Sequence, residues 1–268
     1  MTATDSPNSS PRSFVSSEVR GLVGVVRLVR PERRNALDRG TAVELTRALE
    51  EHLRSDAISA VALLGSSGTF CAGGDLTTLE EAAKTDPVGT LEDFHRLILT
   101  IARADKPILA ALCGAAAGFG ADLALATDLR IASESAFLQE SFIHVGLLSD
   151  GGGTLFLREL IGPARAFSLL ALGQRVAAAE LFQLGIVERV VPEDRLEEEA
   201  LTLAATLGQR APLAMGALKR TLFGPRRAAL EEELRRVREE QIRLLESDDF
   251  NEGVRAFLEK RKPNFSGR

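Results

Sequence analysis

Two glycine-rich turns are the segments best suited to chemistry. The first runs from Gly68 to Leu76 (GTFCAGGDL) and the second from Gly114 to Gly120 (GAAAGFG). Each follows a short apolar run and leads toward a helical pattern, so each exposes backbone N–H groups beside a helix N-terminus. Two such turns that converge would stabilise an oxyanion, such as an enolate or a tetrahedral intermediate. Taken singly, such glycines more often serve tight turns or close packing. Neither turn continues into a phosphate-binding motif.

The elements that would position these turns alternate between strands and helices. Short apolar runs predict strands at 14–19, 22–28, 59–64, 107–112 and 129–132. Helical periodicity follows Asp38 and also covers 88–104 and 121–126. This order predicts an α/β domain with a largely parallel sheet.

The chain divides into three parts. Residues 1–13 are polar and rich in Ser and Pro, which predicts a disordered tail. Residues 14–195 carry the α/β pattern, and residues 196–268 are helical, with helices expected at 196–207, 213–222, 228–245 and 252–261. We expect this C-terminal segment to contribute to oligomerisation.

Composition argues against several classes of protein. The 268 residues are 45% hydrophobic and 26% charged, as in a folded globular protein. A net charge of −5 and the absence of Trp and Tyr argue against nucleic-acid binding and against a membrane belt. There is no secretory h-region and no membrane-spanning run. The two cysteines favour a reducing cytoplasm, and the three histidines have no metal-ligand spacing, so no metal is expected.

Long segments of the chain resemble the crotonase superfamily, also called the enoyl-CoA hydratase/isomerase family. They are Arg33–Leu37 (RRNAL), Phe70–Leu76 (FCAGGDL), Lys106–Ala132 and Gly146–Thr154, and the C-terminal residues 257–265 (FLEKRKPNF) resemble the family's end. The resemblance implies an α/β fold, a crotonase-like spiral of ββα units with a helical C-terminal segment. It also implies acyl-CoA thioester substrates, no cofactor beyond the substrate's own coenzyme A, and a homotrimer or a hexamer built as a dimer of trimers.

The resemblance also assigns roles to single residues. The two oxyanion donors would be the backbone N–H groups of Gly74 and Phe119, in agreement with the two glycine-rich turns. Positions matched to the coenzyme A site are Arg33, Ala36, Ala72, Leu76, Phe257 and Lys260. Arg and Lys suit phosphates as charge-assisted donors. For Lys260, in a run of charged residues, a solvated surface role competes with this one.

The family's hydratases use two glutamates, and this chain departs from both. The first position falls at Asp122, which keeps a carboxylate but would equally complement a helix N-terminus. The second falls at Phe142, whose ring cannot carry a proton. Glu140 lies two residues away, on the same face if this segment is a strand. A two-acid hydratase mechanism is therefore not favoured.

Asp150 supplies a different acid. It lies in LSDGGG, and family members with double-bond isomerase activity look similar there and use an aspartate at this position. One carboxylate suffices to move a proton from one carbon to another, and an apolar pocket would raise its pKa. As a turn or N-cap residue, Asp150 would instead precede the helix at Thr154. We favour an enoyl-CoA isomerase with Asp150 as the proton shuttle.

Several alternatives stay open. A hydratase would use Asp122 and Asp150 together. A dehalogenase or thioester hydrolase would use Asp150 and His95, because His95 resembles the catalytic histidine of the family's chlorobenzoyl-CoA dehalogenases, although its helix is typical of a packing histidine. Cys71 has no neighbouring base and reads as packing rather than as a nucleophile. Non-catalytic binding of CoA thioesters, or of RNA through the basic pairs at 226–227 and 235–236, is the remaining class.

Overall fold

The computed structural model describes residues 13–268, so the predicted tail lies outside the described residues except for Ser13. The larger of two sheets has six strands in the order β1-β2-β3-β4-β6-β9. All neighbours are parallel except the β1–β2 hairpin. The strands are β1 (Val15–Arg20), β2 (Val23–Leu28), β3 (Ala60–Leu64), β4 (Ile108–Leu112), β6 (Leu129–Ser133) and β9 (Arg189–Val191).

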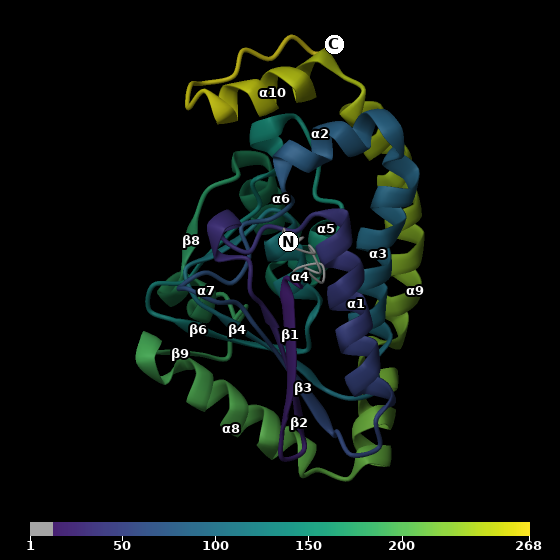
Figure 1. Ribbon diagram of the computed structural model, residues 1–268, viewed down its shortest axis with the longest axis vertical. Helices are drawn as coiled ribbons and strands as arrows, with labels where there is room; N and C mark the ends of the chain where they lie inside the picture. Colours follow the sequence, from purple (N-terminus) through teal and green to yellow (C-terminus); the bar gives the residue numbers. More distant parts are fainter. Residues whose placement is uncertain (1–12) are drawn as a thin grey trace, which may run out of the picture.

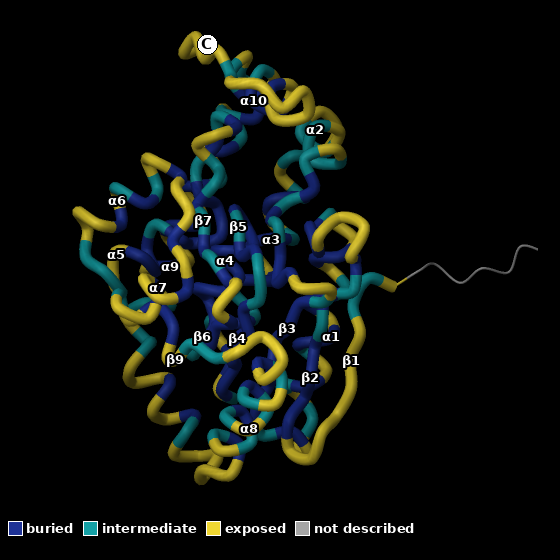
Figure 2. The backbone as a smooth tube through the Cα atoms, turned by 90° about the vertical axis from the view of Figure 1, so that its left-hand side faces the viewer, coloured by how far each residue is buried: buried dark blue, intermediate teal, exposed yellow. Residues whose placement is uncertain are grey.

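The larger sheet is apolar on both faces, as expected for a parallel sheet covered by helices. Alternate residues of β4 belong to two separate core clusters: Ile108 packs with one and Leu109 with the other. Helices α1 (Arg39–Arg54) and α3 (Pro87–Arg103) contribute to the first cluster, and α8 (Leu196–Gly208) to the second. Figure 2 shows β2, β3 and β4 buried in the interior and β1 largely exposed at the edge.

The smaller sheet explains how the chain turns into a spiral. It contains β5 (Ala115–Ala117), β7 (Phe137–Gln139) and β8 (Val176–Ala177). Single parallel bridges, Cys71 with Ala116 and Leu37 with Gly74, continue the same arrangement outward. Each turn of the chain therefore adds a strand to the larger sheet, a short strand or bridge to the smaller one, and then a helix. The predicted spiral of ββα units is confirmed.

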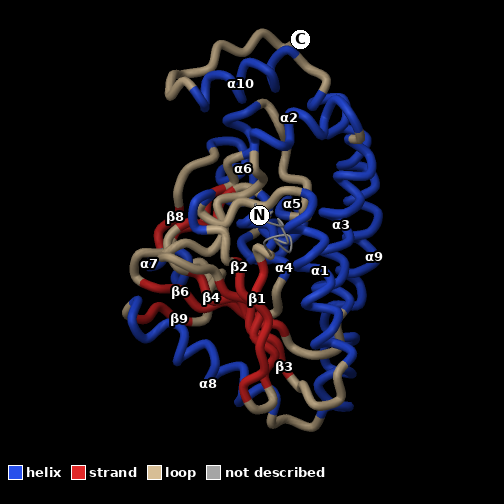
Figure 3. Tube along the Cα trace, in the orientation of Figure 1, coloured by secondary structure: helices blue, strands red, loops and turns tan. Residues whose placement is uncertain are grey.

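Helices surround the sheets, as Figure 3 shows by colour. Capping residues start several of them: Asp38 accepts from the N–H of Thr41 at 2.8 Å to begin α1, and Asp75 caps α2. The helices not yet named are α2 (Leu76–Thr85), α4 (Phe119–Ala126), α5 (Gly153–Ile161), α6 (Pro163–Leu172), α7 (Ala178–Gln183), α9 (Pro212–Leu245) and α10 (Asp248–Leu258), with short 3-10 turns η1 (Pro31–Arg33), η2 (Phe142–Val145) and η3 (Glu193–Arg195).

The C-terminal segment packs on the core rather than around a core of its own. In Figure 1, α8 crosses one face of the larger sheet, α9 runs beside α3, and α10 lies near α2. Among the described residues, no helix combines the length and apolarity needed to span a bilayer.

Three of the predicted C-terminal helices differ from the structure. The separate helices expected at 213–222 and 228–245 form one helix, α9, which continues through Pro225. Both halves of α9 are held by packing, the first through buried Lys219 and the second through Leu230 and Leu234, which outweighs the bond that proline removes. The last helix begins at Asp248 rather than 252, because Ser247 caps it.

Candidate active site

A cavity of about 500 Å³ lies where the carboxyl ends of β5 and β7 meet α2, α3 and α10. Its walls are mainly apolar, and Leu91, Phe94, Phe119, Phe142 and Leu147 are among the residues that line it. The rings of Phe94 and Phe119 meet edge to face, with centroids 4.6 Å apart. A mostly apolar pocket with a few polar groups is the usual form of a small-molecule site.

The two glycine-rich turns converge at this cavity. Gly73 has a φ of +107°, and a Cβ there would lie 2.8 Å from the carbonyl oxygen of Ala117 and 3.6 Å from the nitrogen of Phe119. Only glycine permits both that backbone conformation and so close an approach. The close approach brings the start of α4 against the loop that carries Gly74.

The N–H groups of Gly74 and Phe119 are both free for a ligand. Leu37 donates to the oxygen of Gly73 and accepts from the N–H of Asp75, each at 2.8 Å, so the N–H of Gly74 points away from Leu37. Phe119 is the first residue of α4, where N–H groups have no acceptor within the helix. Neither N–H donates to any acceptor in residues 13–268, and both residues line the cavity. This arrangement matches the requirement for an oxyanion site.

Asp150 lines the same cavity with one carboxyl oxygen held and the other open. Its Oδ2 accepts from Nε2 of Gln241 at 2.8 Å, whereas Oδ1 has no hydrogen-bond partner among the described residues. Burial raises the pKa of Asp150 to about 7, and the hydrogen bond from Gln241 opposes this rise. A carboxyl group with this pKa exchanges a proton near neutral pH. Asp150 does not cap α5, whose N-cap is Gly152.

Gln241 is the site residue that sequence reasoning missed. Its side chain, 1% exposed, also donates to the oxygen of Leu148 at 3.1 Å and accepts from the N–H of Leu148 at 3.2 Å. Gln241 therefore clamps the loop before Asp150 to α9. The available signal was a polar residue at the next position of the apolar stripe formed by Leu230, Leu234 and Val237.

Asp122 and Glu140 lie behind Asp150, and neither lines the cavity. Both are almost fully buried, at 0% and 1% exposure. Burial, and then the nearby charge of Asp150, raises the pKa of Asp122 to about 8. Glu140 follows the end of β7 instead of continuing the strand, so the expected shared face with Phe142 is wrong: Phe142 begins η2 and faces the cavity, while Glu140 points into the interior.

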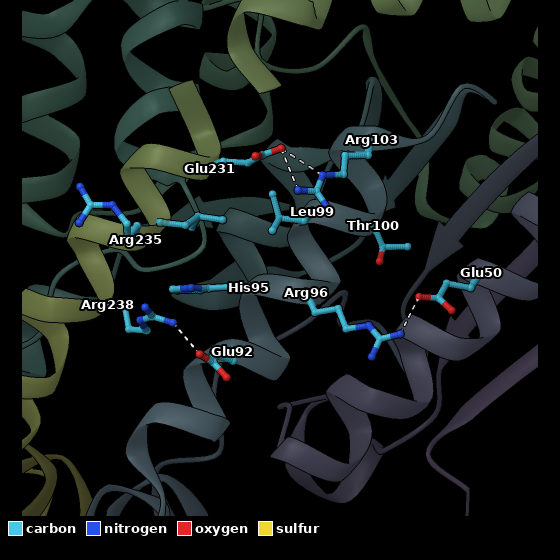
Figure 4. Close-up of a pocket in the computed structure, with 11 residues that line it drawn as sticks. Glu50, Glu92, His95, Arg96, Leu99, Thr100, Arg103, Glu231, Arg235 and Arg238 are labelled. Atoms are coloured by element: carbon cyan, nitrogen blue, oxygen red, sulfur yellow. Dashed lines mark hydrogen bonds and ion pairs between the residues drawn. The ribbon is translucent and has the colours of Figure 1, made fainter. Parts of the chain in front are cut away.

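His95 opens onto a different depression. It lines a groove of about 440 Å³ between α1, α3 and α9, where Arg96, Arg103 and Arg238 are each paired with a glutamate (Figure 4). Burial lowers the pKa of His95 to about 4, and contact with the backbone carbonyl of Asp150 opposes the decrease. The ring is therefore neutral and outside the cavity, which removes the geometric basis for activating water beside Asp150.

Most of the residues matched to the coenzyme A site line the cavity. These are Arg33, Ala36, Ala72, Leu76 and Phe257, joined by Arg34, whereas Lys260 does not line it. Asn35 holds the turn that carries the two arginines, because its Nδ2 donates to the oxygens of Ser66 at 3.1 Å and Thr69 at 2.6 Å. Its φ of +58° is a conformation that asparagine tolerates better than most residues.

Other reactive side chains do not form a site. Burial raises the pKa of the Cys71 thiol to about 12, so it remains protonated. No group of three His, Cys, Asp or Glu side chains within residues 13–268 could hold a metal ion. The basic pairs at 226–227 and 235–236 are neutralised by Glu159, Asp105 and Glu232.

Comparisons with known proteins agree with this geometry. A profile of the enoyl-CoA hydratase/isomerase family matches residues 18–268. A probable enoyl-CoA hydratase of Rhodobacter capsulatus is 38% identical over 94% of this chain and 97% of its own length. The 1,2-epoxyphenylacetyl-CoA isomerase of Escherichia coli is 34% identical, over 95% and 99%.

Among solved structures, an enoyl-CoA hydratase from Mycobacterium avium subsp. paratuberculosis superposes with a TM-score of 0.87 at 29% identity, over 96% of this chain and 100% of that one. The match extends over nearly the whole chain in both sequence and structure. The chain therefore belongs to the enoyl-CoA hydratase/isomerase family and is an acyl-CoA enzyme of that family.

Proposed function

We propose that the chain is an enoyl-CoA double-bond isomerase in which Asp150 moves the proton. The observation that carries this proposal is that Asp150 is the only carboxyl group lining the cavity, within residues 13–268, that has no cationic partner. The other lining carboxyl, Asp75, lies 3.0 Å from Arg30 and caps α2. A single unpaired base beside an oxyanion site suits a reaction that moves one proton and adds nothing.

The reaction balances with these groups alone. The ionised Oδ1 of Asp150 takes a proton from the carbon next to the thioester carbonyl of a 3-enoyl-CoA. The electron pair moves onto the carbonyl oxygen, where the N–H groups of Gly74 and Phe119 stabilise the dienolate. Asp150 then returns the proton at the fourth carbon, and the conjugated 2-enoyl-CoA forms. No water and no further cofactor enters the equation.

The apolar walls support this assignment in two ways. They hold the pKa of Asp150 near 7, where the group is both basic and easily reprotonated. Phe142, which occupies the second acid position of hydratases, places a ring where a water-activating carboxylate would be required. The same walls favour an alkyl or aromatic acyl group over a charged one.

Hydration of a 2-enoyl-CoA is the second candidate, because the R. capsulatus relative is named a probable hydratase. That reaction needs an acid and a base around a bound water. Asp122 is the only partner for Asp150 that the sequence offered, and it lies behind the cavity surface. A dehalogenase or hydrolase would require His95, which faces the separate groove (Figure 4).

The coenzyme A moiety has a matching surface on the same chain. We propose that Arg33 and Arg34 contact its phosphates, while Ala36, Ala72 and Leu76 line the path of the pantetheine and adenine. Phe257 closes this surface from α10, and Lys260 would reach the nucleotide only at its rim.

The deciding experiment is product analysis with a short 3-enoyl-CoA. The wild type should form 2-enoyl-CoA, and Asp150→Asn, which keeps the shape but not the basicity, should lose roughly 10²–10⁴-fold in kcat. Coenzyme A binding, measured by calorimetry, should be unchanged in this variant. Glu240→Gln, an exposed change on α9, serves as the control. Formation of 3-hydroxyacyl-CoA from 2-enoyl-CoA, with no isomerisation, would contradict the assignment.

We also propose a homotrimer or a dimer of trimers as the assembled state. The support is a set of large apolar side chains left exposed on the single chain: Phe167, Leu172, Phe182, Leu213, Leu218 and Leu222. Large apolar side chains that are exposed on one chain are candidates for burial at a subunit interface. Light scattering coupled to size-exclusion chromatography measures the mass directly.

A further inference from the structure

Glu140 is a buried acid that the proposed reaction does not use. Its side chain is 1% exposed, and neither carboxyl oxygen accepts a hydrogen bond from a donor among the described residues. Its carboxyl group lies close to that of Asp122, because a Cβ built on Gly153 would approach both within 2.8 Å. A buried carboxyl with no donor, next to another carboxyl, is costly unless a proton lies between them.

Asp122 connects this acid to the loop that carries Asp150. Its Oδ1 accepts from the hydroxyl of Ser149 at 2.9 Å, and its Oδ2 accepts from the N–H of Gly151 at 2.7 Å. Ser149 and Gly151 flank Asp150 on both sides. The position of the Asp150 backbone therefore depends on the carboxyl group of Asp122.

The glycines after Asp150 make room for this arrangement. A Cβ on Gly153 would lie 2.1 Å from Oδ1 of Asp122 and 2.8 Å from Oε1 of Glu140. A Cβ on Gly151 would lie 2.9 Å from Oδ2 of Asp122. Both carboxyl groups thus lie against Gly153, where a side chain would displace them, whereas a side chain on Gly151 would displace Asp122.

We propose that Glu140 and Asp122 form an acid pair that shares a proton, and that this pair is the positioning device that holds the Ser149–Gly151 loop and aims Asp150 into the cavity. The part of this inference that concerns Asp150 rests on the proposed isomerase function. The acid pair itself does not, because it follows from the contacts of the unliganded protein.

Charge makes the shared proton necessary. No Lys, Arg or His within residues 13–268 forms an ion pair with Glu140, Asp122 or Asp150. The groups that perturb Glu140 are Asp122 on α4 and Asp150 on the loop, and both raise its pKa together with burial. Two carboxyl groups in contact cannot both ionise, and their titration is shared. The pair therefore retains one proton between its two carboxyl groups, and Asp150 is the acid of the cluster that faces the cavity.

Infrared spectroscopy of the unliganded protein tests the pair without any reaction. At pH 8, ordinary Asp and Glu side chains are ionised, so a carboxylic-acid C=O band marks acids that retain a proton. We expect this band in the wild type, a weaker band in Glu140→Gln, and none in the double variant Glu140→Gln/Asp122→Asn. The exposed control Glu240→Gln should leave it unchanged. A wild type without the band, or a band that Glu140→Gln leaves at full intensity, would overturn the pair.

Kinetics test the positioning role. Glu140→Gln keeps a donor toward Asp122, so kcat should stay within about threefold of the wild type, whereas Glu140→Leu should lose roughly tenfold to hundredfold in kcat with little change in KM. In the wild type, activity should also fall at alkaline pH as the pair loses its proton, and Glu140→Gln should retain activity there. An equal loss in Glu140→Gln and Glu140→Leu at every pH would overturn the positioning role. If the protein isomerises nothing but the infrared band behaves as expected, the function fails and the acid pair stands.

Discussion

Two clusters of buried polar groups among the described residues are built in opposite ways. At the amino ends of β4 and β6, Lys219 donates to Asp128 at 2.6 Å and to the oxygen of Lys106 at 2.8 Å. Nearby, the guanidinium of Arg130 donates to the oxygens of Thr127 and Ile186, each at 2.6 Å. Beyond the carboxyl ends of β5 and β7, the acid cluster has no cation, and three of its carboxyl oxygens have no partner among the described residues.

The difference separates structural charge from chemical charge. Buried groups that only stabilise a fold are saturated with partners, because an unpaired buried charge is expensive. In the cluster formed by Asp122, Glu140 and Asp150, no cation offsets the free-energy cost of burying the acids. This burial raises the pKa of each acid. Proteins tolerate such strain chiefly where a proton must be held or moved. The two clusters should therefore respond differently to mutation and to pH.

The largest effect is expected at the saturated cluster. Lys219→Met removes the cation and leaves the partly buried Asp128 with only the N–H of Ile108, at 2.7 Å, as a donor among the described residues. Breaking one side of a buried pair should lower the free energy of unfolding by about 3–5 kcal/mol, as measured by urea denaturation. Lys84→Met, which removes an exposed pair with Glu80, is the matched control and should change stability by less than ~1 kcal/mol. If Lys219→Met and Lys84→Met lowered the free energy of unfolding equally, the buried pair would contribute no more than the exposed one.

The acid cluster should make the protein less stable as pH rises. Burial raises the pKa of Asp122, to about 8, and that of Glu140, so the pair keeps a proton in the folded state that the unfolded chain has already released. The folded state therefore binds more protons, and the free energy of unfolding should fall by about 1.4 kcal/mol per pH unit for each proton retained.

Glu140→Gln sharpens this second test. Urea denaturation between pH 7 and 8.5 should show a flatter slope for the variant, which should be more stable than the wild type at the upper end. Cys71, whose pKa is raised to about 12, adds the same slope to both proteins and cancels in the comparison. An unchanged slope in Glu140→Gln would mean that Glu140 retains no proton in the folded state.

Removing the hydrogen bonds of Gln241 to Asp150 and Leu148 should have an effect on activity of intermediate size. The donor Nε2 of Gln241 favours the ionised carboxylate, so Gln241→Leu should raise the pKa of Asp150 above about 7. The acidic limb of the pH–rate profile then moves to higher pH, and kcat falls roughly tenfold because the loop at Leu148 also loses its anchor. Glu240→Gln, on the exposed side of the same helix, should leave the profile in place. If the acidic limb of the pH–rate profile stays at the same pH in Gln241→Leu, Gln241 is only a packing residue.

The smallest effect is expected in the groove over His95. Arg103 and Glu231 form an exposed pair at 2.8 Å there (Figure 4), and Arg103→Gln should change the free energy of unfolding by less than ~1 kcal/mol. Isomerase activity should stay unchanged, because this pair touches neither the cavity nor Asp150. A large loss of activity would show that the groove is coupled to the site through His95.

Local pattern predicted much of the fold. The helix after Asp38 and the helix at 88–104 were readable from periodicity and capping residues, and they match α1 and α3 closely. The strands of the smaller sheet were not readable, because β5 and β7 have three residues each and β8 has two, too few to show alternation. Continuity of α9 through Pro225 was likewise decided by packing on both halves of the helix.

The candidate site shows the same division between features that the sequence predicted and features that packing decided. The two glycine-rich turns, the candidate base Asp150 and the family itself were visible in the chain, because each depends on neighbours in sequence. The hydrogen bond from Gln241 to Asp150 joins side chains 91 positions apart. The proposed pairing of Glu140 with Asp122 joins the segment after β7 to helix α4, and these meet only when β5 and β7 pair. Whether an acid faces the cavity or the interior depends on how those distant elements pack. Sequence thus determined which groups were present, and only the tertiary structure decided which of three acids meets the substrate cavity.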